Sequence, residues 1–299
     1  AGYATGHFGK WHLGSVQPGS PVNPGASGFD DWLSAPNYYD NDPFMSREGT
    51  AVPLEGESSM IAVDAAIEFM LKHYEADRPF FAVVWFGSPH KPHRATPENR
   101  EPYKDLDEDL QHFYGEITGM DRAFGKLRDE LRALGVHENT LLWYCSDNGG
   151  LPNVGSTGGR ADKGDIYEGG LRVPAILEWP QRLPAPGATD VPCVTSDIYP
   201  TLLGIAGVQM PGQPPLDGID LRPVLEGNMT ERPKPIGFWD YPADGVSTRS
   251  DEILRALYEA QQAGKKLADE KWLRMDAAEI DEQYPLDRFP GHAAWIDWP

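Results

Sequence analysis

Residues 80–86 read FFAVVWF, a continuous apolar run that combines β-branched and aromatic side chains. A run of this kind predicts a β-strand that is buried on both faces of a sheet. Such strands are typical of parallel sheets covered by helices on both sides. The segments on either side of residues 80–86 support this interpretation.

Helices are predicted before and after this strand. Residues 58–74 place apolar side chains on one face at helical spacing, and Arg78-Pro79 ends the segment. A second apolar stripe runs from Leu110 to Leu134, and Gly135 is a natural stop. Further strands are predicted at residues 3–10, 139–147 and 172–179, a further helix at 196–206, and loops at 15–56 and 149–170. The alternation of strands and helices predicts an α/β fold, with a mostly parallel sheet sandwiched by helices.

The texture of the sequence changes past residue 232. IGFWDYP at 236–242 and the start of HAAWIDWP at 292–299 resemble strands, and residues 250–271 are charged and helical. We therefore expect a larger domain at residues 1–232. Residues 233–299 are expected to form the start of a smaller C-terminal subdomain, which is incomplete.

Composition excludes several classes of function. The 299 residues include 26 basic and 46 acidic side chains, a net charge of −20, which argues against nucleic acid as a partner. The sequence contains no run of about 18 apolar residues, so it predicts no membrane-spanning helix. The two cysteines, Cys145 and Cys193, do not form a disulfide framework, and Cys145 is expected to be a buried thiol. Nothing in the sequence indicates the oligomeric state.

The candidate functional residues follow the predicted strands, because ligands of open α/β sheets bind outside the carboxyl ends of the strands. These residues are Lys10 and His12 after the first strand, His90, Lys91 and His93 after the second, Asp147 and Asn148 after the third, and then Lys163, Glu168 and Arg172. Lysine and histidine side chains that face one cavity repel each other unless an anion, such as a sulfate or phosphate ester, lies between them. Asp147 and Asn148 offer the oxygen ligands that Ca²⁺ or Mg²⁺ prefers, although Ca²⁺ takes six to eight.

Each of these residues also has an ordinary interpretation. Taken alone, Lys10 would be interpreted as a solvent-exposed lysine. His90, which precedes Lys-Pro, would be interpreted as an ordinary histidine in a loop. Asp147-Asn148-Gly149-Gly150 is strong turn chemistry. Glu168 and Arg172 can pair with each other, and Trp11 and Trp143 suit a core. It is the joint placement at strand ends that favours a site.

The motifs resemble those of a known family, the sulfatases of the arylsulfatase-A-like branch of the alkaline phosphatase superfamily. The resemblance is carried by five collinear segments between residue 2 and about residue 227: GYATGHFGKWHLG, SPHKPH, WYCSDNGG, KGDIYEGGLRVPAI and DIYPTLLGIAG, followed by DGIDLRPVLEG. It implies an alkaline-phosphatase-like fold in which residues 1–232 form a catalytic domain that lacks its N-terminal part. It also implies a periplasmic or secreted location, and a sulfated small molecule or glycan as substrate.

The resemblance further implies a role for each candidate. Lys10 would contact the sulfate and the nucleophile, and His12 would hold the nucleophile. His90 and Lys163 would bind the ester on its leaving-group side, one of them helping to protonate the departing alkoxide. Asp147 and Asn148 would bind a divalent cation, Ca²⁺ rather than Mg²⁺. The nucleophile of the family is a formylglycine, and covalent catalysis of this kind needs no direct attack by water on sulfur.

One departure from the family is serious. The formylglycine arises from a cysteine or serine in a C-x-P-S-R type motif, which neither YCSDN nor PCVTS matches. A pair of N-terminal metal-binding aspartates is missing too. We therefore expect a chain truncated at its N-terminus and at its C-terminus, which is inactive by itself.

Three alternatives remain open. The first is a phosphate or phosphonate ester hydrolase of the same superfamily, which would differ from a sulfatase in its substrate. A non-catalytic relative that binds sulfated glycans would carry a replacement of the C-x-P-S-R motif upstream. A short protein that never had the N-terminal part is the third. The sequence does not identify the sulfate ester.

Overall fold

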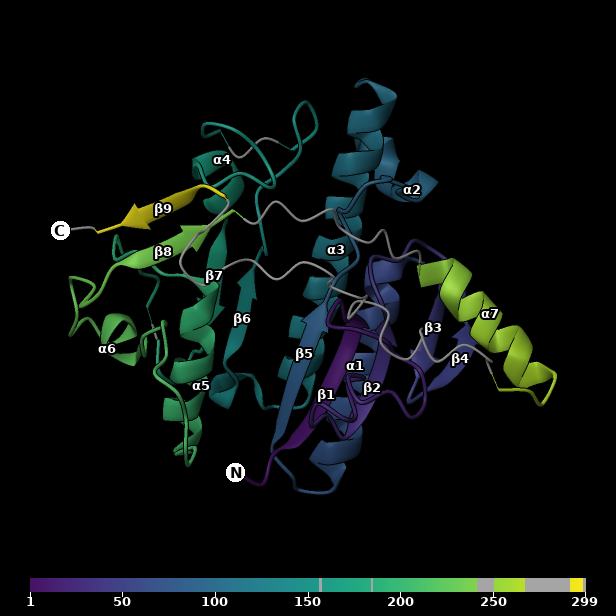
Figure 1. Ribbon diagram of the computed structural model, residues 1–299, viewed down its shortest axis with the longest axis horizontal. Helices are drawn as coiled ribbons and strands as arrows, with labels where there is room; N and C mark the ends of the chain where they lie inside the picture. The colour runs from purple at the N-terminus through teal and green to yellow at the C-terminus, as the bar shows by residue number, and fades with distance from the viewer. Residues whose placement is uncertain (156–157, 184, 241–249, 267–290, 298–299) are drawn as a thin grey trace. The chain divides into compact units, whose positions relative to one another are not determined.

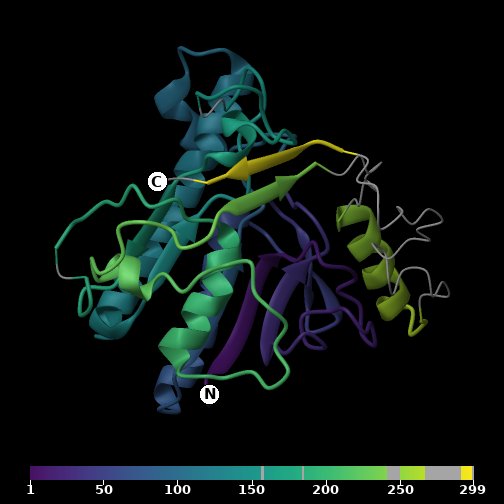
Figure 2. The same cartoon turned by 60° about the vertical axis from the view of Figure 1, so that its left-hand side comes forward.

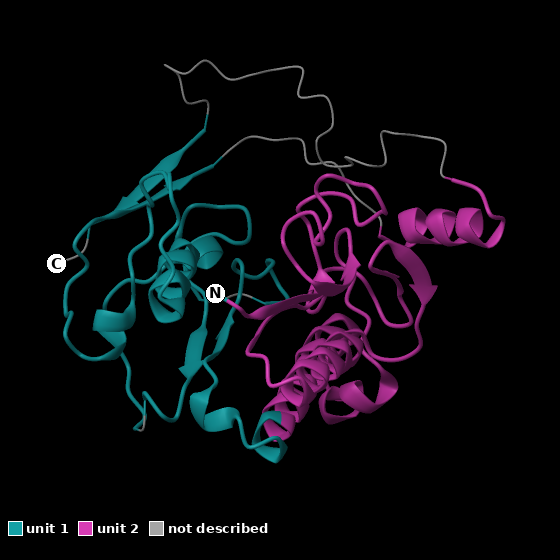
Figure 3. Cartoon of the chain, turned by 90° about the horizontal axis from the view of Figure 1, so that it is seen from below, with its two compact units in different colours: residues 1, 131–243, 284–299 teal, residues 2–130, 244–283 magenta. Residues whose placement is uncertain are grey.

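The computed structural model describes residues 1–155, 158–183, 185–240, 250–266 and 291–297 (Figure 1). These residues form two compact units (Figure 3). Unit 2 comprises residues 2–130 and 250–266, and unit 1 comprises residues 1, 131–240 and 291–297. Both combine strands with helices, so the predicted α/β class is confirmed.

The sheet of unit 2 has five strands in the order β4-β3-β2-β1-β5. Strand β1, Ala4–Lys10, lies in the centre and pairs in parallel with β2, Asp31–Ala35, and with β5, Phe80–Trp85. Strands β3, Phe44–Arg47, and β4, Thr50–Pro53, continue the sheet in antiparallel fashion. The sheet is therefore mixed rather than mostly parallel.

The loop predicted at residues 15–56 is wrong, because β2, β3 and β4 lie within it. These strands have only four or five residues, and Asp, Ser, Arg and Thr within them hide the apolar pattern. The turn between β3 and β4 carries a usable signal, however. Glu48 and Gly49 both have positive φ, at 51° and 93°, as a two-residue type I′ hairpin requires.

Strand β5 differs from its prediction in burial. Its first five residues are half-buried, and the side chain of Trp85 is 43% exposed. The reason is its place in the sheet: β5 pairs with β1 on one side and forms the last strand in the order of this sheet. An apolar run therefore indicated the strand correctly but not how fully it is covered.

Two long helices form as predicted: α1, Ser58–Glu75, in unit 2 and α3, Glu108–Ala133, whose last three residues belong to unit 1. Helix α1 packs against β1, β2 and β5, and begins where the Glu57 side chain accepts a hydrogen bond from the Met60 N–H at 2.8 Å. Helix α3 buries Leu127 and Leu131 of the predicted stripe. Two short helices precede α3: α2, Pro97–Arg100, and the 3₁₀-helix η1, Glu101–Tyr103.

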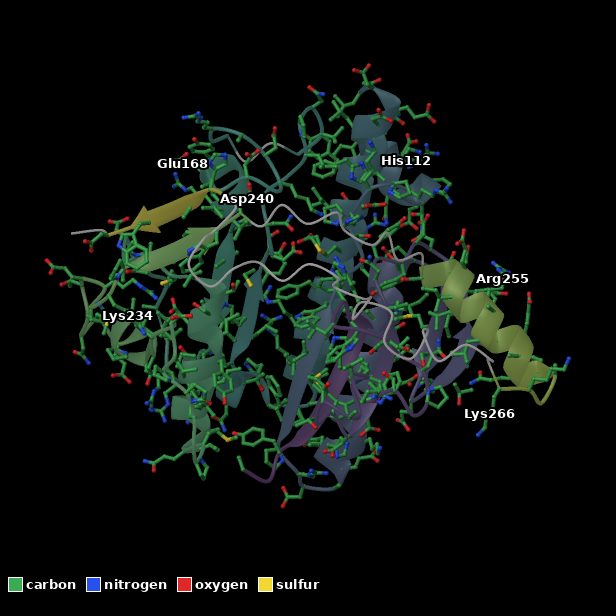
Figure 4. All side chains as sticks on the ribbon, viewed as in Figure 1. His112, Glu168, Lys234, Asp240, Arg255 and Lys266 are labelled. Atoms are coloured by element: carbon green, nitrogen blue, oxygen red, sulfur yellow. The ribbon has the colours of Figure 1, made fainter. Side chains whose placement is uncertain are left out.

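Helix α7, Ser250–Gln262, packs against β3 and β4. The guanidinium of Arg255 on α7 (Figure 4) lies 4.6 Å from the ring centroid of Phe44 on β3, and Gln261 bonds the backbone of residues 49 and 51. The helix expected at 250–271 ends at Gln262, residues 263–266 are not helical, and residues 267–271 lie outside the described residues. Helix α7 belongs to unit 2, so the compact units are not divided at residue 232, and the C-terminal subdomain stays a prediction.

Unit 1 contains two pairs of strands. Strand β6, Leu142–Cys145, pairs antiparallel with β7, Ala175–Glu178, rather than in the expected parallel sheet. Strand β8, Ile236–Trp239, pairs antiparallel with β9, Ala293–Ile296 (Figure 2), and confirms both strands expected at residues 236–242 and 292–299. The other elements are η2, His137–Asn139, α4, Glu168–Leu171, η3, Thr195–Asp197, α5, Ile198–Ala206, and α6, Arg222–Leu225.

A buried ion pair organises the segment around α5. The side chains of Asp197 and Arg232 are 0% and 3% exposed, and two bonds of 2.8 Å join them. Asp197 also accepts the N–H groups of Val194 and Ile219. Trp143 packs against the apolar cluster of Val191, Ile219, Leu221 and Val224 beside this pair, which agrees with its predicted place in the core.

None of the helices within the described ranges has the length and hydropathy needed to cross a membrane. Cys145 and Cys193 are both free thiols, so the prediction of no disulfide framework is confirmed. Cys145 is half-buried, and burial raises the pKa of its thiol.

Candidate active-site residues

Strand β1 ends in Lys10, and the next two residues turn over the neighbouring strand. The Trp11 N–H donates to Ala35 O at 2.7 Å, and the His12 N–H donates to Pro36 O at 3.0 Å. Trp11 is buried, and its indole N–H donates to Val22 O at 2.9 Å. The burial of Trp11 agrees with its predicted place in the core. On either side of it, Lys10 is half-buried and His12 is exposed. Backbone bonds to the end of β2 therefore fix where Lys10 and His12 leave the sheet.

Strand β5 is followed by the loop 86–95, which carries His90. The His90 N–H donates to Gly87 O at 3.2 Å, and its ring Nδ1 lies 2.6 Å from Lys91 O. The ring also stacks on Tyr38, with centroids 4.6 Å apart and planes at 10°. His90 is thus held within an ordered loop. His93 lies in the same loop, and its pKa is lowered, chiefly by burial.

The register of the sheet brings these two strand ends together. Gly9 of β1 is opposite Trp85 of β5 in a parallel pairing, so both strands end at the same edge. A Cβ atom on Gly9 would lie 1.9 Å from Trp85 O, so only glycine allows this close approach. Lys10, His12 and the loop that carries His90 therefore follow strands that end at the same edge of one sheet.

Asp147 and Asn148 follow strand β6 in unit 1. Asp147 is exposed and Asn148 is half-buried. The Asn148 side-chain N–H donates to Gly149 O at 3.0 Å, and the Ser146 hydroxyl donates to Asn148 O at 3.0 Å. The amide nitrogen of Asn148 is thus used within the turn, and Oδ1 is the atom that suits a cation.

Lys163 lies against this turn. Its N–H donates to Gly150 O at 2.9 Å, and the Gly149 N–H donates to Gly170 O of α4 at 2.8 Å. A Cβ on Gly149 would lie 1.8 Å from Gly169 O, so the glycines let the two segments pack backbone to backbone. Unit 1 therefore brings Asp147, Asn148 and Lys163 together, and the side chain of Lys163 is exposed.

Glu168 and Arg172 are at the two ends of α4. Glu168 (Figure 4) is exposed, as is Arg172. A backbone hydrogen bond joins them, from the Arg172 N–H to Glu168 O at 2.8 Å. This bond closes the short helix and shapes the glycine-rich loop.

The donor atoms present suit a hard cation only in part. A carboxylate and an amide oxygen side by side are the types of ligand that Ca²⁺ and Mg²⁺ prefer. Within the described residues, however, no group of three or more His, Cys, Asp or Glu side chains is arranged to hold a metal ion. Asp147 and Asn148 therefore fit the chemistry of the ion and leave most of its coordination shell to other ligands.

Two residues that contact the His90 loop were missed by the sequence analysis. Tyr38 lies three residues past the end of β2, in a segment that was interpreted as loop. Glu116 on α3 is 7% exposed, and its Oε1 accepts the Arg94 N–H at the end of the His90 loop. Burial, with smaller contributions from Asp40 and Glu57, raises the pKa of Glu116 to about 8. The strand-end rule would have pointed to Tyr38 if β2 had been recognised.

Comparison with known proteins identifies related chains. The family model described as Sulfatase matches residues 1–208. The chain is 30% identical over 262 residues to N-acetylgalactosamine-6-sulfatase of Canis lupus familiaris, an alignment that covers 78% of this chain and 48% of the relative. It is 32% identical over 263 residues to arylsulfatase A of Homo sapiens, covering 76% and 49%.

A solved structure is similar as well. The crystal structure of Ps i-CgsB in complex with k-i-k-neocarrahexaose superposes with a TM-score of 0.74 at 27% identity, over 80% of this chain and 59% of that chain. The chain spans about half the length of the curated relatives it matches.

Proposed function

The chain belongs to the sulfatase family, and from that membership we propose that the intact protein hydrolyses a sulfate ester of a carbohydrate. The observation that carries the proposal is the shared sheet edge at which β1 and β5 present Lys10, His12 and His90 within the matched residues 1–208. An ammonium group and two imidazoles at one edge suit a tetrahedral oxyanion. The strongly negative chain needs such a local cluster to attract an anionic substrate.

We assign each candidate the role that the family suggests. Lys10 contacts the sulfate oxygens and lowers the cost of the charge that develops on them. His12 holds the nucleophile, and His90 and Lys163 bind the ester on its leaving-group side. One of these two supplies the proton that the departing alkoxide needs.

The nucleophile of this proposal is not among the 299 residues, because none of them lies in a C-x-P-S-R type motif. A formylglycine would supply an oxygen nucleophile for covalent catalysis. Asp147 and Asn148 would hold part of a divalent cation, for which we propose Ca²⁺, and that cation would neutralise charge on the sulfate. The proposed activity is therefore that of the full-length protein.

A carbohydrate substrate is supported by the names of the relatives. One relative is named N-acetylgalactosamine-6-sulfatase, and the similar solved structure is a complex with k-i-k-neocarrahexaose. Another relative is named arylsulfatase A, so an aryl sulfate is the second candidate substrate. A periplasmic or secreted location is part of the same proposal, because a sulfated polysaccharide is met outside the cytoplasm.

The test is a substrate panel for the full-length protein. Sulfated mono- and oligosaccharides, aryl sulfates and the matching phosphate esters are incubated with it, and released sulfate or phosphate is measured by ion chromatography. Sulfate release from a sugar ester supports the proposal. Faster release of phosphate than of sulfate from matched esters, or binding of sulfated sugars without release by protein that carries the modified motif, would overturn it.

A further inference from the structure

We propose that Tyr38 is a positioning residue that holds the His90 imidazole in the orientation needed to protonate the leaving group. The inference rests on the leaving-group role proposed above for His90 and Lys163, and it assigns the proton to His90. Tyr38 does not act on the substrate in this proposal; it acts through His90.

The contact between the two rings is a parallel stack. Their centroids are 4.6 Å apart and their planes differ by 10°. Both residues are half-buried. Rotation of the imidazole out of this plane would break the stack, so Tyr38 restricts the ring to one plane.

A second contact selects the nitrogen that exchanges the proton. His90 Nδ1 lies 2.6 Å from the carbonyl oxygen of Lys91, and a carbonyl oxygen only accepts hydrogen bonds. Nδ1 therefore carries the donated proton, and Nε2 is the nitrogen that gains and loses one. The stack fixes the plane of the ring, and the carbonyl fixes which way it faces within that plane.

The backbone beneath Tyr38 is itself fixed. The Asn37 N–H donates to the hydroxyl of Ser250, the first residue of α7, at 2.9 Å, and the Tyr38 N–H donates to Asn37 Oδ1 at 2.8 Å. A Cβ on Gly87 would lie 2.6 Å from Tyr39 O, so the chain on either side of the stack is packed backbone to backbone. Tyr38 is therefore a firm support, and α7 is part of it.

The His90 loop is anchored at both ends. Near its start, the hydroxyls of Ser88 and Ser58 are 3.3 Å apart. At its end, Asn41 Nδ2 donates to Arg94 O at 2.7 Å, and Glu116 accepts the Arg94 N–H. Neither partner of the stack depends on the other for its backbone position, so removing the Tyr38 ring changes the freedom of the imidazole more than the course of the loop.

The chemistry makes the role of Tyr38 measurable. As the S–O bond to the alcohol breaks, its electron pair goes to the leaving oxygen, while sulfur forms a bond to the nucleophile. A sugar alkoxide is a poor leaving group and needs the proton from His90 Nε2 in the transition state. A nitrophenolate is stable as an anion and leaves without one. Loss of positioning should therefore slow sugar sulfates selectively.

The experiment compares variants of the full-length protein on two substrates, a hexose sulfate and 4-nitrophenyl sulfate. We expect Tyr38→Leu to lower kcat/KM for the hexose sulfate ~10- to 100-fold and for the nitrophenyl ester less than ~3-fold. Tyr38→Phe keeps the stacking ring and should stay within ~3-fold of the wild type on both. Tyr74→Leu, at an exposed position near the end of α1, is the matched control. Equal losses of Tyr38→Leu on both substrates, or none, would overturn the inference.

Two further variants keep the outcome decisive. Ser250→Ala removes the hydroxyl that accepts the Asn37 N–H. It should lower kcat/KM for the hexose sulfate less than Tyr38→Leu does, again with little effect on the nitrophenyl ester. This variant tests the inference if Tyr38→Leu does not fold. His90→Gln separates the two proposals. If His90→Gln is selective for the hexose sulfate and Tyr38→Leu is not, the positioning inference fails while the proposed function stands. If His90→Gln shows no selectivity, the role proposed for His90 fails, and the inference falls with it.

Discussion

Replacing Glu116 with glutamine should remove a large part of the pH dependence of stability between pH 5 and 8. Glu116 is 7% exposed on α3, and its Oε1 accepts the Arg94 N–H at the end of the His90 loop. Burial, with smaller contributions from Asp40 and Glu57, raises its pKa from the ordinary value of 4.5 to about 8. The folded protein therefore holds a proton on Glu116 that the unfolded chain has lost.

The sign and size follow from proton linkage. Between pH 4.5 and about 8 the folded state binds one more proton than the unfolded state, so stability falls as the pH rises. Each pH unit in this range costs about 1.4 kcal/mol. A neutral glutamine can still accept the Arg94 N–H and has no proton to lose. The advantage of Glu116→Gln over the wild type should therefore grow by ~3–4 kcal/mol from pH 5 to pH 8.

The assay is urea unfolding of the intact protein at pH 5, 6.5 and 8. Buried His7 has a pKa lowered to about 3 and affects stability below pH 6.5, but it is present in both proteins and cancels in the comparison. Glu68→Gln, on the exposed face of α1, is the control and should change stability by less than ~0.5 kcal/mol at each pH. A difference between Glu116→Gln and the wild type that stays constant with pH would refute the reasoning.

Three other changes test the fold and the proposed metal ligands. Asp197→Ala leaves the Arg232 charge buried without its partner and should destabilise the protein by ~3–5 kcal/mol in urea unfolding; a loss below ~1 kcal/mol would show that the pair is dispensable. Gly9→Ala places a Cβ 1.9 Å from Trp85 O, so it should abolish the native circular dichroism spectrum, and an unchanged melting temperature would contradict the register of β1 and β5. Asp147→Ala in the full-length protein should weaken calcium binding, measured by calorimetry, at least ~10-fold, whereas Asp165→Ala should not; equal affinities would remove Asp147 from the ligands.

The parts of the fold that were predictable from the sequence are those with a clear local pattern. Helix α1 and helix α3 carry apolar stripes over many turns, and β5 is a continuous apolar run. The antiparallel pairing of β6 with β7 could not be predicted in this way. Strand direction depends on where the long connection between them leads, and local periodicity does not record that.

The candidate residues show the same limit. Lys10 and His90 were found because each follows a recognisable strand. Tyr38 follows β2, whose five residues DWLSA have too few apolar positions for a periodic signal. Its support by Ser250 joins residues more than 200 positions apart, and no spacing rule reaches that far.

The most direct test of the proposed activity is sulfate release from a sulfated sugar by the full-length protein and by its Lys10→Ala variant. Lys104→Ala, which removes an exposed lysine paired with Glu101, is the matched control. We expect the wild type and Lys104→Ala to release sulfate at similar rates and Lys10→Ala to lose at least ~100-fold in kcat/KM. Equal rates for Lys10→Ala and Lys104→Ala, or no sulfate release by a wild type that carries the formylglycine, would contradict the proposal.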